Sequence, residues 1–161
     1  MIHHFSIAAQ DPERVAAVLA ELTGGQSFNF SPFPGSRIVL VGDAHGTGVE
    51  IYPLGLELAP GEGGAPVRSL ANPAPSDFTA THAALSVALD EAGILRIAGR
   101  EGWRALTCTR TVAFQVIEFW LENRVMIELL TPGMARDYLR AIAPGNIEDA
   151  RRQAAEAESQ G

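Results

Sequence analysis

The chain carries the same arrangement of residues twice, and this repetition constrains its fold more than any other feature. His4 precedes Glu50 by 46 positions (50 − 4), and His82 precedes Glu128 by 46 positions (128 − 82). Each histidine opens a segment of alternating polar and apolar residues, and each glutamate lies in a short apolar run that leads to a proline. Repetition on this scale predicts two similar structural units that pack against each other.

Local patterns predict the same order of elements in both halves. In each half an alternating strand comes first, and an aspartate, Asp11 or Asp90, then caps an amphipathic helix. Three further strands are expected in each half, at residues 27–30, 37–41 and 49–52 and at residues 103–107, 112–120 and 125–130. The predicted fold class is α+β: two βαβββ modules form a curved mixed-sheet cup with the helices on its convex face.

Composition marks the boundaries of these modules, which together form one domain. The modules are expected at residues 1–58 and 81–132. Residues 59–80 between them are rich in proline and glycine, and the whole stretch from 53 to 80 is expected to be a linker or a long irregular loop. Residues 133–161 are expected to be a C-terminal helical extension with an exposed, charged end.

Strand alternation predicts that the two histidines and the two glutamates share one face of the cup. Val49 and Ile51 are expected to face the helices, which turns Glu50 to the opposite side, and the same parity applies to Glu128. The residues two and four positions past each histidine are small: Ser6, Ala8, Ala84 and Ser86. Small side chains at these places predict a cavity that receives a substrate.

Two imidazoles and two carboxylates on one face are a set of ligands for a metal ion. His4, Glu50, His82 and Glu128 suit nickel, cobalt, zinc, manganese or iron, and they match calcium or magnesium poorly. Glutamates that face a cavity repel each other and lose hydration, and a bound cation removes that cost. A lone histidine would be better explained as an ordinary polar residue of a sheet, but the matched repeats favour one divalent transition metal per two-module unit.

The two halves resemble the glyoxalase/bleomycin resistance/dioxygenase (vicinal-oxygen-chelate) superfamily, and they are most similar to glyoxalase I. The resemblance spans residues 2 to about 132 and is carried by segments 4–7, 11–12, 48–51, 82–87 and 125–129. It implies that the first and last strands of each module supply the metal ligands, and that Glu128 or Glu50 acts as the general base. The implied chemistry is chelation of two adjacent substrate oxygens and stabilisation of an enediolate.

The resemblance also implies an assembly. In this superfamily the cup is often closed by a second copy of the chain, so that His4 and Glu50 of one subunit meet His82 and Glu128 of the partner subunit. The long stretch 53–80 would permit either this exchange or closure within one chain. A homodimer is the favoured expectation.

The chain departs from glyoxalase I where that enzyme holds glutathione. The family's usual arginine and asparagine, each four residues past a metal ligand, correspond here to Ala8 and Leu54. Arg37 and Arg68 could replace the missing charge if loops bring them over the cup. The prediction is a metal-dependent, glyoxalase-like lyase or isomerase for a small oxygenated substrate, and not a glutathione-dependent enzyme.

Two other classes of function stay open at this point. A dioxygenase or a fosfomycin-type transferase usually uses two histidines and one glutamate, which would leave Glu50 as a surplus ligand. A non-catalytic binding or resistance protein of the same fold needs no metal, so all four ligands would be without a purpose. Bound metal separates the enzymes from the binding protein.

Charge and composition exclude several other functions. The 161 residues carry a net charge of −7 and no basic run, so neither nucleic acid nor an anionic membrane is expected as a partner. The chain contains no lysine, which excludes Schiff-base chemistry and a Walker-type phosphate loop. No apolar run reaches the roughly 18 residues of a membrane span, and a cytoplasmic protein is expected.

Overall fold

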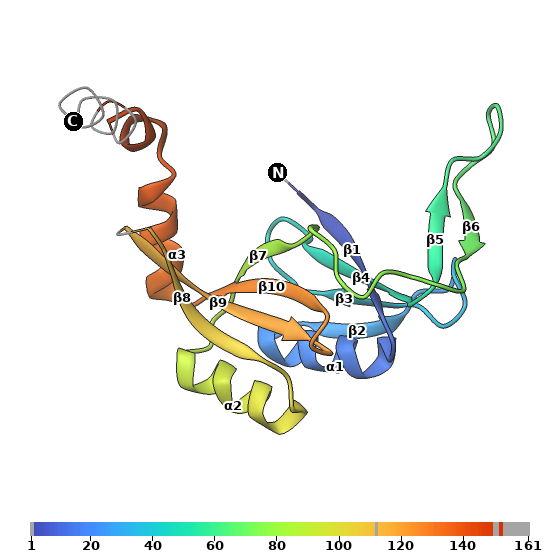
Figure 1. Cartoon of the computed structure of the whole chain (residues 1–161), viewed down its shortest axis with the longest axis horizontal. Helices are drawn as coiled ribbons and strands as arrows, with labels where there is room; N and C mark the ends of the chain where they lie inside the picture. Colours follow the sequence, from blue (N-terminus) through green and yellow to red (C-terminus); the bar gives the residue numbers. More distant parts are fainter. Residues whose placement is uncertain (1, 112, 150–151, 153–161) are drawn as a thin grey trace.

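The computed structural model describes residues 2–111, 113–149 and 152 of the chain, and its strands form two four-stranded mixed sheets (Figure 1). The first sheet has the order β1 (His4–Ala9), β4 (Gly48–Pro53), β3 (Arg37–Leu40) and β2 (Gln26–Asn29). The second has the order β7 (Ala83–Ser86), β10 (Val125–Leu130), β9 (Phe114–Leu121) and β8 (Ala105–Thr111). In both sheets the first and last strands of the module pair in parallel and the other neighbours are antiparallel. The two βαβββ modules predicted from the repeat are confirmed.

Helices α1 (Pro12–Thr23) and α2 (Glu91–Glu101) cover the same side of the two sheets (Figure 1). Asp11 and Asp90 cap them as expected, since each side chain accepts a hydrogen bond from the backbone N–H three residues later. Each helix ends at a glycine in the left-handed conformation.

Apolar side chains on the helix side of both sheets form one continuous core. Val49 and Ile51 of β4 and Leu129 of β10 are fully buried, as their parity predicts. Glu50 and Glu128 therefore point to the face that α1 and α2 leave uncovered. Among the described residues no strand pairs across the two sheets, so the cup stays open in a single chain.

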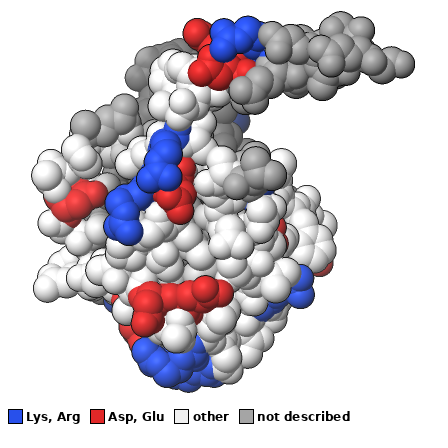
Figure 2. All heavy atoms as spheres, turned by 90° about the vertical axis from the view of Figure 1, so that its left-hand side faces the viewer, with Lys and Arg blue, Asp and Glu red and all other residues white. Residues whose placement is uncertain are grey.

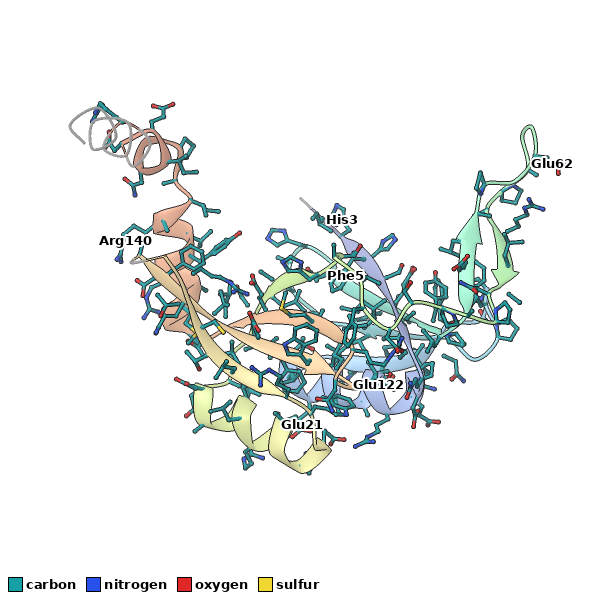
Figure 3. The ribbon with its side chains drawn as sticks, in the orientation of Figure 1. His3, Phe5, Glu21, Glu62, Glu122 and Arg140 are labelled. Atoms are coloured by element: carbon teal, nitrogen blue, oxygen red, sulfur yellow. The ribbon has the colours of Figure 1, made fainter. Side chains whose placement is uncertain are left out.

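The stretch expected to be irregular contains a hairpin. Strands β5 (Leu56–Ala59) and β6 (Arg68–Ala71) pair antiparallel and project from the first module, with Glu62 at the tip (Figures 1 and 3). The sequence pattern did not reveal it because both strands are only four residues long and lie largely exposed among prolines and glycines. A strand that packs against no core leaves little hydrophobic periodicity in the sequence.

The C-terminal extension begins with helix α3 (Pro132–Ala141), which lies on the opposite side of the second sheet from α2 (Figure 1). Tyr138 of α3 packs edge-on against Phe114 of β9, with the ring centroids 5.3 Å apart. Residues 144–149 form a further, exposed helical segment, and the rest of the expected extension, residues 150–151 and 153–161, lies outside the described part of the chain. The face of the molecule seen in Figure 2 carries acidic and basic side chains in small mixed groups. Within the described ranges, no helix combines the length and apolar character needed to cross a bilayer.

The turn between β9 and β10 connects the second module to the first through hydrogen bonds. Glu122, at the seam between the modules in Figure 3, accepts hydrogen bonds of 2.7 Å from the backbone N–H groups of both Gln10 and Asp11. These two donors stand at the start of α1, where unpaired N–H groups and the helix dipole favour a carboxylate. One side chain thus joins the two modules through two charge-assisted hydrogen bonds.

Replacing Glu122 with glutamine is expected to lower the free energy of unfolding by about 1–3 kcal/mol, because the amide offers one acceptor oxygen where the carboxylate offers two. Urea unfolding followed by circular dichroism measures the change. Glu62→Gln, at the exposed tip of the hairpin, is the matched control and should leave stability unchanged. Equal midpoints for Glu122→Gln and the unmodified protein would show that the turn does not hold the modules together.

Candidate metal centre

The first module brings two of the four predicted ligands together. His4 Nε2 lies 3.8 Å from Glu50 Oε1, on neighbouring parallel strands. The imidazole is 61% exposed and the Glu50 side chain only 13% exposed. Two ligands bonded to one ion at about 2.1 Å stand roughly 3–3.5 Å apart. A small rotation of the exposed imidazole would therefore allow one divalent ion to contact both side chains.

Two hydroxyl groups hold the other oxygen of Glu50. Ser6 Oγ donates to Glu50 Oε2 at 3.0 Å, and the Tyr52 hydroxyl donates to the same oxygen at 2.7 Å. Burial, together with the hydrogen bond to Glu50, raises the pKa of Tyr52 to about 12, so the phenol stays protonated as a donor. Oε2 is thus occupied, and Oε1 is directed towards His4.

Tyr52 was not singled out in the sequence, although the signal was present. It follows Glu50 by two positions in a strand and therefore lies on the same face of the sheet. The corresponding position of the second module is Leu130, which has no hydroxyl group. The two glutamates therefore have different surroundings.

In the second module Glu128 is paired with an arginine that the sequence analysis did not identify. Arg110 of β8 contacts Glu128 Oε1 through Nε at 2.9 Å and through Nη2 at 2.6 Å. The same Nη2 donates to Glu118 Oε1 at 2.8 Å. Arg110 thus forms ion pairs with two carboxylates that face the same side of the sheet.

Strand register explains why Glu118 belongs to this group. Glu118 of β9 lies directly opposite Glu128 of β10, so both point to the open face. Burial favours a higher pKa for Glu118, but hydrogen bonds from Arg110 and Trp120 outweigh it and hold the pKa below its ordinary value. Half-buried Cys108 lies nearby on β8, and burial together with the charge of Glu118 raises the pKa of its thiol.

Among the described residues, His82 forms no ion pair with another predicted ligand of this chain. It directly precedes β7, its side chain is exposed, and its Nδ1 is 3.0 Å from the carbonyl oxygen of Ala80. Among the described residues, no three His, Cys, Asp or Glu side chains gather closely enough to hold a metal ion. A single chain thus presents the His4–Glu50 pair on one sheet and Glu128 on the other.

The small residues predicted to line the cavity fall into two groups. Ser6 and Ala8 line a cavity of about 230 Å³ between the modules, and Leu54 contributes to the same wall. Ala84 and Ser86 are exposed on the open face of the second sheet and do not line that cavity. Ala84 stands opposite Glu128 in the register, as Ser6 stands opposite Glu50.

Neither arginine considered as a partner for glutathione reaches the cup. Arg37 pairs with Ile51 in the register and therefore points to the helix side, where it donates hydrogen bonds to Asn29 and Ser27. Arg68 is exposed on β6 of the projecting hairpin. The possibility that these residues compensate for Ala8 and Leu54 has no support in this arrangement.

Known proteins provide a comparison for this arrangement. The chain matches no protein-family model and no curated protein sequence. Its structure is similar to the fosfomycin resistance protein FosX from Listeria monocytogenes complexed with Mn(II) and sulfate ion, with a TM-score of 0.57 and 13% identity over 89% of this chain and 97% of that chain. A glyoxylase/bleomycin resistance protein/dioxygenase domain from Frankia sp. EAN1pec gives a TM-score of 0.52 and 9% identity over 81% of this chain and 96% of that chain. This chain has the vicinal-oxygen-chelate fold.

The vicinal-oxygen-chelate fold is the one that the resemblance in the sequence implies, and the fold prediction is confirmed. A mutant of the same FosX, complexed with Mn(II) and 1S,2S-dihydroxypropylphosphonic acid, has a TM-score of 0.55 and 13% identity over 87% of this chain and 96% of that chain. In that protein the vicinal-oxygen-chelate fold holds a divalent metal ion together with a small oxygenated ligand.

Proposed function

We propose that this chain is a metal-dependent enzyme that removes a proton from a small oxygenated substrate, as a glyoxalase-like lyase or isomerase does. The observation that carries the proposal is the His4–Glu50 pair, whose 3.8 Å separation and open Glu50 Oε1 suit a divalent ion. When bound, nickel, cobalt, zinc, manganese or iron supplies a Lewis acid that polarises a substrate carbonyl and acidifies the neighbouring C–H. Similarity to FosX, which is crystallised with Mn(II), supports a divalent metal in this fold.

The two glutamates take different roles in this proposal. Glu50 is a fixed ligand, because Ser6 and Tyr52 hold its Oε2 and leave Oε1 for the ion. Glu128 accepts the substrate proton. Arg110 can transfer its hydrogen bonds to Glu118 when Glu128 changes position, since the guanidinium already contacts both carboxylates.

We also propose that the complete site forms in a homodimer. His4 and Glu50 of one chain would meet His82 and Glu128 of the partner subunit, because among the described residues a single chain gathers no three potential ligands. Both half-sites face the open side of their sheets, where a second copy could approach. Dimerisation would exclude water from the cup and strengthen the electrostatic interactions within it.

The volume and the lining of the cavity favour a small substrate. Its volume of about 230 Å³ lies below the roughly 300–1,000 Å³ of sites that take drug-sized ligands. Ala8 and Leu54 offer neither charge nor amide groups to the two carboxylates of glutathione. The substrate class proposed here is therefore a small α-hydroxycarbonyl compound without a glutathione group.

A non-catalytic small-molecule binding or resistance protein is the second candidate, and one observation favours it. Arg110 forms ion pairs with both Glu128 and Glu118 in a single chain. A protein that only sequesters a ligand could use this arrangement as it stands. Metal content distinguishes the two candidates.

Exchange of substrate C–H protons tests the proposed chemistry directly. In heavy water, the metal-loaded protein is expected to exchange the C–H protons next to the carbonyl of hydroxyacetone, dihydroxyacetone or lactaldehyde, measured by proton NMR. Glu128→Gln should slow exchange about 100- to 10,000-fold while the metal is retained, because the amide oxygen can still ligate but cannot accept the proton. Glu57→Gln, on the hairpin, serves as the control. Exchange no faster than with the free metal ion, for all three compounds, would contradict the proposal.

A further inference from the structure

Arg124 is a buried charge whose hydrogen bonds are incomplete. It is the last residue of the turn between β9 and β10, and its side chain is only 9% exposed. Nη2 donates to the carbonyl oxygen of Ser76 at 3.0 Å, and Nε donates to Asp77 Oδ1 at 3.2 Å. The buried Nη1 has no hydrogen-bond partner among the described residues. A guanidinium offers five N–H donors and no acceptor, so this buried donor is unsatisfied.

Asp77 compensates that charge only in part. Its side chain is 74% exposed and contacts Arg124 through a single oxygen. A carboxylate largely in water contributes little to a buried charge, because solvent screens it and competes for its hydrogen bonds. A second anionic partner would therefore find an arginine that is still poorly neutralised.

An anionic partner for Arg124 could bind in the cavity between the modules. Arg124 lines it together with the hydroxyl-bearing residues Ser6, Ser76, Thr79 and Thr81. Hydroxyl groups and a guanidinium are the donors that proteins use for carboxylate and phosphate oxygens. Asp77 is the only acidic residue in the wall of this cavity as the structure describes it. Its exposure allows it to turn towards solvent.

The backbone holds Arg124 in this position. Glu122 and Asn123, which precede it, both have left-handed backbone conformations, with φ of 51° and 57°. Glu122 is held by the first module, and Asn123 Oδ1 accepts a hydrogen bond from the backbone N–H of Arg104. The cost of these conformations is thus offset by contacts on both sides, which present Arg124 to the seam between the modules.

We propose that Arg124 forms an oxyanion subsite and that the ligand is a carboxylate, phosphate or phosphonate group of the substrate. The subsite adjoins the metal centre, since Ser6 lines the cavity and also donates to Glu50. The inference rests on the proposed function for one point only, that the anion is part of the substrate. The substrate is then a small anionic hydroxycarbonyl compound with one negatively charged end.

Binding of inorganic phosphate to chelator-treated protein tests the subsite independently of any metal. Calorimetry should detect binding to the unmodified protein and to the control Arg68→Met, and Arg124→Met should weaken it roughly tenfold or more. Asp77→Asn should instead tighten binding roughly threefold, because it removes the internal competitor. A purely structural arginine would show the opposite, with Asp77→Asn leaving phosphate affinity unchanged or weaker. That result, or no binding to the unmodified protein, would overturn the proposal even if Arg124→Met fails to fold.

A second measurement links the subsite to the reaction. In the deuterium-exchange experiment the metal-loaded protein should exchange dihydroxyacetone phosphate faster than dihydroxyacetone, and Arg124→Met should remove the difference. Phosphate binding without exchange of either compound would contradict the proposed function and leave the subsite intact. Exchange of both compounds at equal rates in the unmodified protein would overturn the assignment of the anion to the substrate.

Discussion

Purified without chelator, the protein is expected to hold about one divalent transition metal ion per two-module unit. His4→Ala, Glu50→Ala, His82→Ala and Glu128→Ala should each abolish binding, because the loss of one ligand leaves the remaining charges poorly compensated. Inductively coupled plasma mass spectrometry measures the content. His45→Ala is the matched control, since His45 is exposed in the turn before β4 and lies outside the predicted ligand set. The enzyme proposal would be contradicted if the purified protein held no metal and did not rebind nickel, cobalt, zinc, manganese or iron.

Mixing two inactive variants distinguishes a shared site from a site within one chain. His4→Ala and His82→Ala chains, unfolded and refolded together, should recover about a quarter of the original metal content, since half of the dimers formed are mixed and each mixed dimer has one intact site. Each variant refolded alone should recover none. A mixture that also recovers none would contradict the proposed exchange between subunits.

The second prediction with a large expected effect is that the protein has very little glyoxalase I activity. The metal-loaded protein is expected to be a poor glyoxalase I, with lactoylglutathione formation from methylglyoxal and glutathione far below the typical enzyme turnover of about 10 per second. Glutathione carries two carboxylates, and burial of one without a donor costs on the order of several kcal/mol. Ala8 and Leu54 provide no hydrogen-bond donor in their side chains, and Arg124 can pair with only one of the two carboxylates of glutathione.

Steady-state absorbance at the thioester wavelength measures this reaction, with an authentic glyoxalase I as positive control. Ala8→Arg introduces the missing cation where the cavity wall is formed by β1. It should raise the rate if charge alone limits the reaction. Turnover near 10 per second by the unmodified protein would show that contacts to glutathione come from other residues.

The repeat allowed the fold to be predicted because both halves carry the same pattern of apolar and polar residues, which indicates two similar modules. Alternation at Val49–Ile51 and at Ile127–Leu129 specifies which side of each strand is buried, and the structure buries those four side chains. Alternation is a property of a few consecutive residues, so it survives in the sequence. The β5–β6 hairpin has no buried face, and the sequence therefore carried no comparable signal for it.

The candidate site was only partly predictable, because Ser6 and Arg110, which contact Glu50 and Glu128, come from other strands. Position within a strand was enough to place Glu50 and Glu128 on the open face. Arg110, in contrast, becomes a partner of Glu128 only because β8, β9 and β10 lie side by side in one sheet, with an irregularity in the β8–β9 register at Arg110 itself. A shift of one residue in either pairing would turn Arg110 or Glu118 to the opposite face.

The sequence by itself determined the two modules, the buried faces of β1, β4, β7 and β10, and the residue types available as ligands, since these depend on spacing along the chain. Only the tertiary structure decided that Ser6 and Tyr52 hold Glu50, that Arg110 holds Glu128, and that Arg124 lines the cavity between the modules. The hydrogen bond from Ser6 to Glu50, for example, joins residues 44 positions apart. Hydrogen bonds and ion pairs act over a few ångströms in space, and the distance along the chain does not reveal which groups will meet.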